Sequence, residues 1–338
     1  MNRTKQANSI QQTLVLILFT MIFVFLIGCG EKAQEKVYKV GILCGLDYIT
    51  ILHDGFKTKM TELGYVEGKN IVYNYQRTNF EPEKEKKILK QFIKDKSDLI
   101  LTFPTEVSMA AKAATQGTDV QVIFAIANIE GTNLVDSVIK PGGQITGVRF
   151  PGPDLAIKRF EVMRELTPNA KRMWVPYQRG YPIVASQMKE LYPVAEAAGI
   201  TLIEFPADNA AEIQAELDTR KKSNTIDFDA IFFIPEPLSC TDDAFAVMGN
   251  FAYEQKIPIG GILMEVGDYG SIFGINVDVR KTGEQAAVLA DKILKGTPAG
   301  TIPVISSESY LEINYKVAQE LGVTVPEGLL SRADRIIR

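Results

Sequence analysis

The feature that most limits how this chain can fold is a regular alternation between short apolar runs and longer amphipathic segments, which begins near residue 38. The runs at 99–103 and 120–125 are predominantly apolar, and segment 81–94 carries apolar side chains at helical spacing. Strands of this kind are buried on both faces. The pattern therefore predicts a parallel sheet with helices packed on both sides.

The alternation occurs twice. It breaks at Phe150-Pro151-Gly152-Pro153 and then restarts with a second run of similar length. Without its N-terminal segment the chain has roughly 310 residues, which is more than a single domain with one hydrophobic core usually contains. The sequence thus predicts an α/β fold with two doubly wound parallel-sheet lobes. The strands are expected at 37–43, 71–75, 99–103, 120–125 and 145–148 in the first lobe, and at 172–175, 201–205 and 230–234 in the second.

The segments after residue 270 do not belong cleanly to the second lobe. A strand at 271–277, a helix at 280–294 and a β-rich stretch at 303–314 can return to the first lobe and cross again. Several crossings between two lobes form a hinge, in which backbone rotations at a few residues allow the lobes to close. The predicted divisions are 38–148 plus 277–303 for lobe 1, 149–276 plus 304–325 for lobe 2, and 326–338 for a C-terminal tail.

The N-terminal segment indicates export. Arg3 and Lys5 precede an apolar run at 14–27. Fourteen helical residues reach only ~21 Å, short of the ~30 Å hydrocarbon core, which is typical of a signal peptide rather than a membrane span.

The run ends in Leu26-Ile27-Gly28-Cys29, which resembles a bacterial lipobox. Residues 1–28 are then the signal peptide of a lipoprotein, Cys29 carries the lipid (palmitate), and 29–37 forms a tether. The expected location is the cell envelope, anchored through lipid only, facing the periplasm or the exterior. An ordinary signal peptide or an uncleaved anchor with a chance cysteine remains the alternative.

Charge and motif content exclude several classes of function. The chain carries 37 basic and 41 acidic residues, a net charge of −4, and loss of residues 1–28 would remove only two basic residues. Nucleic-acid binders instead concentrate basic charge. The single histidine, His53, lies within a predicted helix, and no nucleotide-binding, hydrolase or zinc motif occurs. We therefore expect no enzyme activity, no metal and no cofactor, and we expect Cys44 and Cys240 to remain unpaired thiols.

A parallel α/β sheet places its ligand at the carboxyl ends of its strands. We expect Thr105 to cap the helix that follows it, and the aromatic residues at strand ends to form apolar walls with polar tips. The candidate ligand-binding residues are Leu46, Asp47, Tyr48, Pro104, Thr105, Glu106, Asn128, Phe150, Tyr177, Tyr181, Pro235, Glu236 and Leu263.

Several stretches together resemble a known family. They are Gly55-Phe56, 62–70 (ELGYVEGKN), 140–143 (KPGG), 146–148 (TGV), 167–172 (TPNAKR), 256–259 (KIPI), and 283–296 with 302–304 (IPV). The chain resembles ABC-transporter substrate-binding lipoproteins of the periplasmic-binding-protein type 1 fold, and more narrowly the subfamily associated with tryptophan and tyrosine uptake. The resemblance implies a monomer that closes two lobes on a solute and docks on an ABC permease with its ATPase.

The chain departs from these relatives where the ligand would lie. At three places the relatives commonly carry polar residues: Asp or Ser, an Asp-Asn pair, and a Thr-Asp-Pro-like segment. This chain has Leu263 at the first place, Pro237-Leu238 at the second and Ala127-Asn128-Ile129 at the third. An ammonium group buried without partners costs several kcal/mol. The departures argue against the usual α-amino acid, unless Glu106 or Glu236 substitutes, and favour a less polar or aromatic solute.

The same lobes also suit a second class of function. Lobe closure could instruct a membrane sensor kinase or receptor instead of a permease, and the sequence does not separate the two partners.

Overall fold

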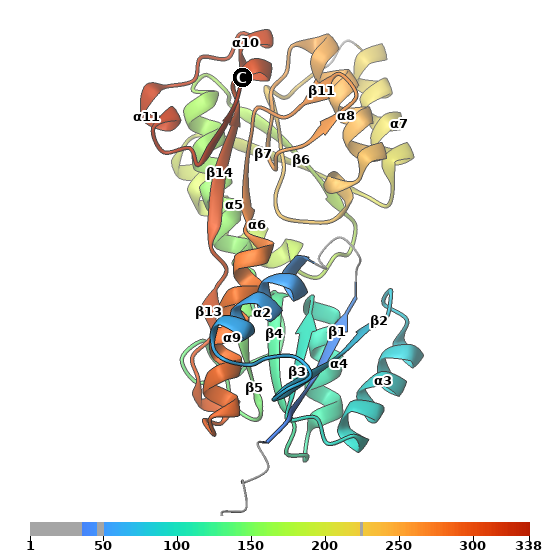
Figure 1. The fold of residues 1–338 in the computed structure, drawn as a ribbon. Helices are drawn as coiled ribbons and strands as arrows, with labels where there is room; N and C mark the ends of the chain where they lie inside the picture. Colours follow the sequence, from blue (N-terminus) through green and yellow to red (C-terminus); the bar gives the residue numbers. More distant parts are fainter. Residues whose placement is uncertain (1–35, 46–50, 224–225) are drawn as a thin grey trace, which may run out of the picture.

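The computed structural model describes residues 36–45, 51–223 and 226–338. Within them the chain forms two α/β lobes, each built around its own mostly parallel sheet (Figure 1). The predicted fold class is therefore confirmed. Residues 1–35, which contain the expected signal peptide and Cys29, lie outside the described residues.

The first lobe contains a six-stranded sheet in the order β13-β5-β4-β3-β1-β2, with all neighbouring strands parallel. The strands are β1 (Tyr38–Cys44), β2 (Ile71–Arg77), β3 (Leu99–Phe103), β4 (Gln121–Ala127), β5 (Ile145–Arg149) and β13 (Ile305–Ser306). The helices are α2 (Ile51–Glu62), α3 (Pro82–Lys94), α4 (Thr105–Thr115) and α9 (Val279–Leu294), with a short 3₁₀ helix η3 (Ala299–Thr301).

Helices cover both faces of this sheet, as the apolar strands require. On one face, Phe56 of α2 and Leu289 of α9 pack in the same buried cluster. On the other face, Phe92 of α3 and Val107 of α4 form a second cluster. All five residues of β3 are buried, because helices lie above and below it.

The second lobe contains a seven-stranded sheet in the order β15-β14-β12-β9-β8-β6-β7. Its strands are β6 (Arg172–Gln178), β7 (Thr201–Ala207), β8 (Ala230–Phe232), β9 (Ile259–Gly261), β12 (Phe273–Val277), β14 (Ser309–Asn314) and β15 (Arg335–Ile337). A small hairpin is formed by β10 (Glu265–Val266) and β11 (Tyr269–Gly270). The helices are α5 (Gly152–Leu166), α6 (Val184–Ala197), α7 (Ala210–Lys222), η2 (Leu238–Cys240), α8 (Asp242–Gln255), α10 (Tyr315–Glu320) and α11 (Glu327–Leu330).

One part of this sheet departs from the parallel arrangement. Strand β14 runs antiparallel to β12, and β15 pairs parallel to β14 at the sheet edge. The segment 326–338, expected as a C-terminal tail, thus contains α11 and an edge strand, and Leu329 is fully buried. The reason is that β14 offers a free edge on which the short run Arg335–Ile337 forms backbone hydrogen bonds.

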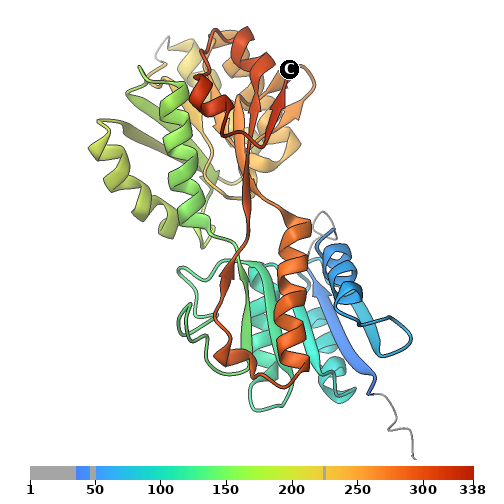
Figure 2. The ribbon, with the colours of Figure 1, turned by 60° about the vertical axis from the view of Figure 1, so that its left-hand side comes forward.

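Three segments connect the lobes, after β5, after β12 and after β13, and Figure 2 shows them together at a narrow waist. They are joined to one another by backbone hydrogen bonds. The Ser307 N–H donates to the Arg149 carbonyl at 2.9 Å, and the Asp278 N–H donates to the Glu308 carbonyl at 3.0 Å. A waist of this kind allows the lobes to move through changes at few residues.

The two cysteines of the described region lie in different lobes. Cys44 ends β1, Cys240 ends η2, and no disulfide occurs among the described residues. The same part of the chain contains no helix that is both long and apolar enough to span a membrane.

Candidate functional site

The carboxyl ends of the strands of both lobes meet near the waist, and most of the candidate ligand residues lie there. Leu46, Asp47 and Tyr48 fall outside the described residues. Pro104, Thr105 and Glu106 lie between β3 and α4, Asn128 follows β4 and Phe150 follows β5. Tyr177, Tyr181, Pro235, Glu236 and Leu263 lie at or just after strand ends of the second lobe.

Thr105 joins two of these loops. Its hydroxyl oxygen accepts a hydrogen bond from the backbone N–H of Asn128 at 3.0 Å. The expectation that Thr105 caps α4 is wrong, because Pro104 is the N-cap residue and Thr105 is the first helical residue. The hydroxyl instead fixes the start of the loop after β4 against the start of α4, and so it positions Asn128.

The aromatic residues at the strand ends mostly pack against their own lobe. Phe150, Tyr177 and Tyr181 are partly buried against the core of the second lobe. The Tyr177 hydroxyl donates to a carboxylate oxygen of Glu204 at 2.7 Å, on the neighbouring strand. Burial, followed by this hydrogen bond, raises the pKa of Tyr177.

Glu236 is buried, and its carboxylate holds its own loop in place. One oxygen accepts the backbone N–H groups of Gln178 and Leu238, each at 2.9 Å, and the other accepts the N–H of Ser239 at 2.6 Å. These bonds connect the end of β6 to η2. Glu106, in contrast, is exposed at the start of α4. Leu263, the apolar residue at one of the departures, follows β9 and is partly buried.

Beside these loops lies a buried arginine. Arg159 of α5 donates through Nε and Nη2 to the Ile275 carbonyl at 2.9 and 2.8 Å, and through Nη1 to the Phe233 carbonyl at 3.3 Å. Desolvation lowers the pKa of this guanidinium to about 10. Arg159 therefore connects the middle of β12 to the residue that follows β8.

Two carboxamide side chains, one from each lobe, converge on Gly152 at the start of α5. A Cβ atom added to Gly152 would lie 2.9 Å from Asn128 Oδ1 and 3.7 Å from both Cδ and Nε2 of Gln187. Asn128 is 6 % exposed and Gln187 is fully buried. The Gln187 Nε2 group donates to the Pro235 carbonyl at 2.6 Å, whereas Gln187 Oε1 has no hydrogen-bond partner among the described residues.

Gln187 was not among the residues that the sequence indicated. Its one signal is its place in the buried stripe of α6, where Val184, Met188 and Leu191 are apolar and Gln187 is not. A polar side chain in the buried stripe of a helix needs a hydrogen-bond partner. Such a residue can therefore indicate a site when the structure shows which groups surround it.

A pocket of about 350 Å³ opens between the lobes next to this carboxamide pair. Its volume falls within the range of roughly 300–1,000 Å³ that is typical of small-molecule sites. Its lining comes from the loop after β4 in the first lobe and from the first turns of α5 and α6 in the second: Glu130, Gly131, Pro153, Asp154, Ile157, Ser186, Lys189 and Glu190.

An ion-pair network forms one side of this pocket. Arg149 pairs with Glu130 in the first lobe and with Asp154 of α5 at 2.7 Å, and its Nε donates to the Ser306 hydroxyl of β13 at 2.8 Å. One guanidinium thus contacts both lobes and the last residue of β13, directly before the third connecting segment. The second oxygen of Glu130 is buried without a hydrogen-bond partner among the described residues.

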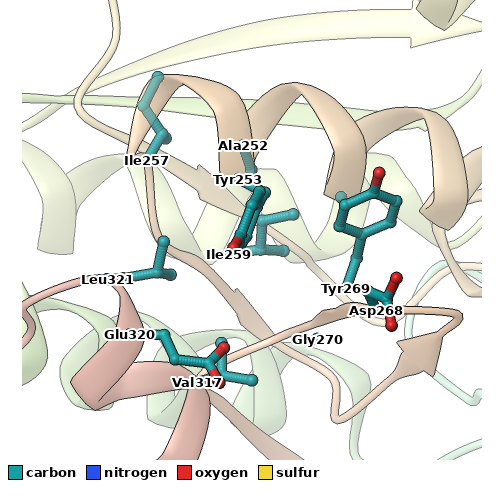
Figure 3. A pocket seen from close by; sticks show the side chains of 11 residues that line it. Ala252, Tyr253, Ile257, Ile259, Asp268, Tyr269, Gly270, Val317, Glu320 and Leu321 are labelled. Atoms are coloured by element: carbon teal, nitrogen blue, oxygen red, sulfur yellow. The ribbon is translucent and has the colours of Figure 1, made fainter.

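A second pocket lies away from the waist, under the β10–β11 hairpin. Figure 3 shows its lining, with Tyr253 of α8, Tyr269 of β11 and Leu321 after α10. Its volume is about 10 Å³, which is roughly the space of one water molecule. The pocket between the lobes is therefore the candidate ligand site. Within the ranges that the structure describes, no group of three or more His, Cys, Asp or Glu side chains is arranged to hold a metal ion.

Comparisons with known proteins agree with this geometry. Residues 43–337 match a family described as ABC transporter substrate binding protein. A tyrosine-binding protein from Clostridioides difficile (strain R20291) is 28% identical over 265 residues, which is 77% of this chain and 73% of the relative.

Solved structures show the same architecture. An ABC domain in complex with L-Trp from Streptococcus pneumoniae superposes with a TM-score of 0.74 at 26% identity, covering 89% of this chain and 100% of the other. The ligand-free, open structure of a substrate binding protein with adhesive properties from Clostridium difficile gives a TM-score of 0.73 at 21% identity, covering 89% and 99%. At that identity the second likeness shows the fold alone.

Proposed function

Because this chain belongs to the family of ABC transporter substrate binding proteins, we propose that it traps a small aromatic or weakly polar solute between its lobes and delivers it to an ABC permease. The observation that carries the proposal is the pocket of about 350 Å³ whose walls come from both lobes, beside the connecting segment that follows β5. Movement at the waist changes the distance between those walls, so binding and lobe closure are coupled.

The relatives support the choice of solute class. One relative bears the name tyrosine-binding protein, and a structural neighbour is a complex with L-Trp. Both ligands carry an aromatic ring. In this chain, the pocket wall combines two apolar residues, Pro153 and Ile157, with polar and charged ones, which suits a ring that also carries polar substituents.

The partners follow from the family. A closed pair of lobes is the form that a permease and its ATPase recognise, and the family match favours transport over signalling through a sensor kinase. Both walls of the pocket belong to one chain, so we propose that the protein works as a monomer. We further propose that Cys29 carries a lipid that anchors it to the outer face of a membrane.

The test is a binding screen with the lipid-free protein, residues 30–338. L-tryptophan, L-tyrosine, aromatic acids, nucleosides and sugars are added singly and the melting temperature is measured. A ligand at a hundred times its Kd stabilises the folded state by about 2.7 kcal/mol. We expect stabilisation by aromatic solutes, followed by calorimetric Kd values. Stabilisation by sugars or nucleosides alone would contradict the proposed solute class.

Transport is tested separately in cells. Deletion of the gene should abolish uptake of the radiolabelled solute identified in the screen, and plasmid-borne wild-type protein should restore it. Unchanged uptake together with loss of a transcriptional response to that solute would instead indicate a sensing role.

A further inference from the structure

We infer that the lysines on the exposed face of α3 form a docking surface for anionic lipid headgroups, beside the point where the chain leaves toward its proposed lipid anchor. The inference rests on the proposed anchor at Cys29 and adds to it the face of the first lobe that contacts the membrane. We call the four residues of this surface the lysine stripe: Lys86, Lys87, Lys90 and Lys94.

The stripe follows from the amphipathic pattern of α3. The apolar side of the helix is held on β1, where a Cβ atom added to Gly41 would lie 2.6 Å from Cδ2 of Phe92. The lysine stripe lies on the opposite side, since Lys86, Lys90 and Lys94 repeat every four residues. All four lysines are exposed, and none has an ion-pair partner in the part of the chain that the structure describes.

The stripe is a local excess of positive charge on an acidic chain, whose net charge is −4. The exposed side of α3 carries one acidic residue beside the four lysines, Glu83 in the first turn. Lys84 and Glu81 pair with each other at 3.6 Å, and the loop after the helix adds one charge of each sign, Asp95 and Lys96. The stripe therefore keeps a positive charge that an anionic surface complements.

The chain enters the described structure next to the C-terminal end of α3. Lys39 Nζ donates to the carbonyl of Asp95, the C-cap residue of α3, at 3.1 Å, and Lys36 pairs with Asp98 at 2.7 Å. Cys29 lies seven residues before Lys36, and an extended chain of that length spans at most about 25 Å. A lipid on Cys29 therefore keeps the stripe within reach of the membrane surface.

The position of α3 leaves the rest of the protein free to act. The helix lies on the side of the first lobe away from the connecting segments (Figure 1), and it contributes no residue to the pocket between the lobes. A single lipid chain gives only reversible membrane binding, and a basic patch is a second contact that makes the binding stable. A membrane is the partner that we infer, because the anchor holds the stripe near it whether or not a permease is present.

The first experiment uses the lipid-free protein, residues 30–338, which includes every described residue. The protein is mixed with vesicles of phosphatidylcholine, alone or with an equal part of phosphatidylglycerol, and the bound fraction is measured by sedimentation. The stripe variant changes all four lysines to glutamine, which has nearly the same helix propensity. The matched control makes the same change at four exposed lysines of the second lobe: Lys158, Lys171, Lys222 and Lys316.

We expect the wild-type protein to bind the anionic vesicles at least about tenfold more tightly than the neutral ones at low ionic strength. This preference should vanish at about 1 M salt, where the Debye length is about 3 Å. The stripe variant should lose the preference, and the control should keep it. Equal losses in both would show that only the net charge matters, which overturns the inference. Should the stripe variant not fold, Lys86→Gln combined with Lys90→Gln should give an intermediate preference.

The second experiment uses the acylated protein and measures its transfer from one vesicle population to another. The stripe variant should leave anionic vesicles at least about fivefold faster than the wild type, and it should leave neutral vesicles at the same rate. Equal transfer rates from anionic vesicles would overturn the inference. Normal vesicle binding by the stripe variant together with reduced solute uptake in cells would also overturn it, since the stripe would then dock on an acidic protein surface.

The inference and the proposed anchor fail separately. Failure of the anchor appears when the full-length protein does not partition into detergent, an assay to which the lysine stripe contributes nothing. Failure of the stripe appears in the vesicle binding of the lipid-free protein, which contains no lipid. Solute binding by the stripe variant should equal that of the wild type, because the pocket between the lobes contains none of the four lysines.

Discussion

Gly283 of α9 lies so close to Leu52 of α2 that a Cβ atom on the glycine would come within 2.0 Å of the Leu52 carbonyl oxygen. The approach is reciprocal, since a Cβ on Gly55 would lie 2.2 Å from the Arg280 carbonyl oxygen. Helix α9 begins directly after the second connecting segment, and α2 follows residues 46–50, where three candidate ligand residues lie. The crossing thus holds α2 against the helix that begins at the waist.

Gly283→Ala should therefore destabilise the protein by about 1–3 kcal/mol, because backbone atoms of α2 must move to admit the methyl group. Chemical denaturation of the lipid-free protein measures the change. The matched control is Gly328→Ala in α11, where an added Cβ meets nothing within 4 Å, and its effect should stay within about 0.5 kcal/mol. Equal effects for the two variants would show that the helices separate easily.

Arg149 is expected to stabilise the contact between the lobes. Arg149→Met leaves Glu130 and Asp154 without their cation and should lower the free energy of unfolding by about 1–3 kcal/mol, since Arg149 and Glu130 are less than one third exposed. Arg179 also has two carboxylate partners, but it is half-exposed and within one lobe. Arg179→Met should cost at most about 1 kcal/mol in the same urea titration. An Arg149→Met protein as stable as the wild type would exclude this role.

Glu236 offers a way to separate a structural role from a binding role. Its carboxylate accepts three backbone N–H groups, and Glu236→Gln replaces one acceptor oxygen by a donor. We expect a loss of about 1–3 kcal/mol of stability, measured by thermal denaturation without ligand. Glu161→Gln, an exposed change on α5, is the control. Unchanged stability with weakened solute binding would instead make Glu236 a ligand group.

The main elements of the fold were predictable because their signals are local. Strand 99–103 and helix 81–94 were expected from apolar spacing, and the structure has β3 at Leu99–Phe103 and α3 at Pro82–Lys94. The edge strand Arg335–Ile337 gave no such signal. It has three residues, and its partner β14 is set by the antiparallel return of the chain. Pairings of this kind depend on long-range topology.

The site was less predictable for a related reason. The strand ends could be placed from the sequence, but the direction of each side chain could not. Tyr177 is at a strand end, yet its hydroxyl contacts Glu204 of the adjacent strand. Gln187 lies within a helix, and its role depends on Gly152 and Pro235, which are 35 and 48 residues away in the chain. Contacts of this kind are set by packing between elements that lie far apart in the chain.

The lipid anchor has a direct test. Cys29→Ser removes the thiol on which acylation depends, so the full-length protein should leave the detergent phase in a detergent-partition assay. Cys240→Ser, which changes a cysteine of η2, is the control and should remain in the detergent phase. Retention of the Cys29→Ser protein would show an uncleaved N-terminal anchor in place of a lipid.

Glu85 gives a pH-dependent prediction. Its side chain is buried at the start of α3, and the Thr78 hydroxyl donates to one of its oxygens at 3.0 Å. Burial is the largest influence and raises the pKa of Glu85 above its ordinary value of 4.5; the Thr78 hydrogen bond opposes this rise and the nearby Glu106 adds to it.

Between the unfolded and the folded pKa of Glu85, the folded protein binds more protons than the unfolded chain. Stability therefore falls as the pH rises through that window, and the ionised group is a cost at neutral pH. Glu85→Gln keeps an acceptor for Thr78 and removes the charge. We expect it to raise the melting temperature at pH 7, with a gain that shrinks as the pH falls to 4.5. Glu83→Gln, an exposed change in the same turn, should show no such trend. A gain that is constant across this pH range would mean that Glu85 ionises at no cost in the fold.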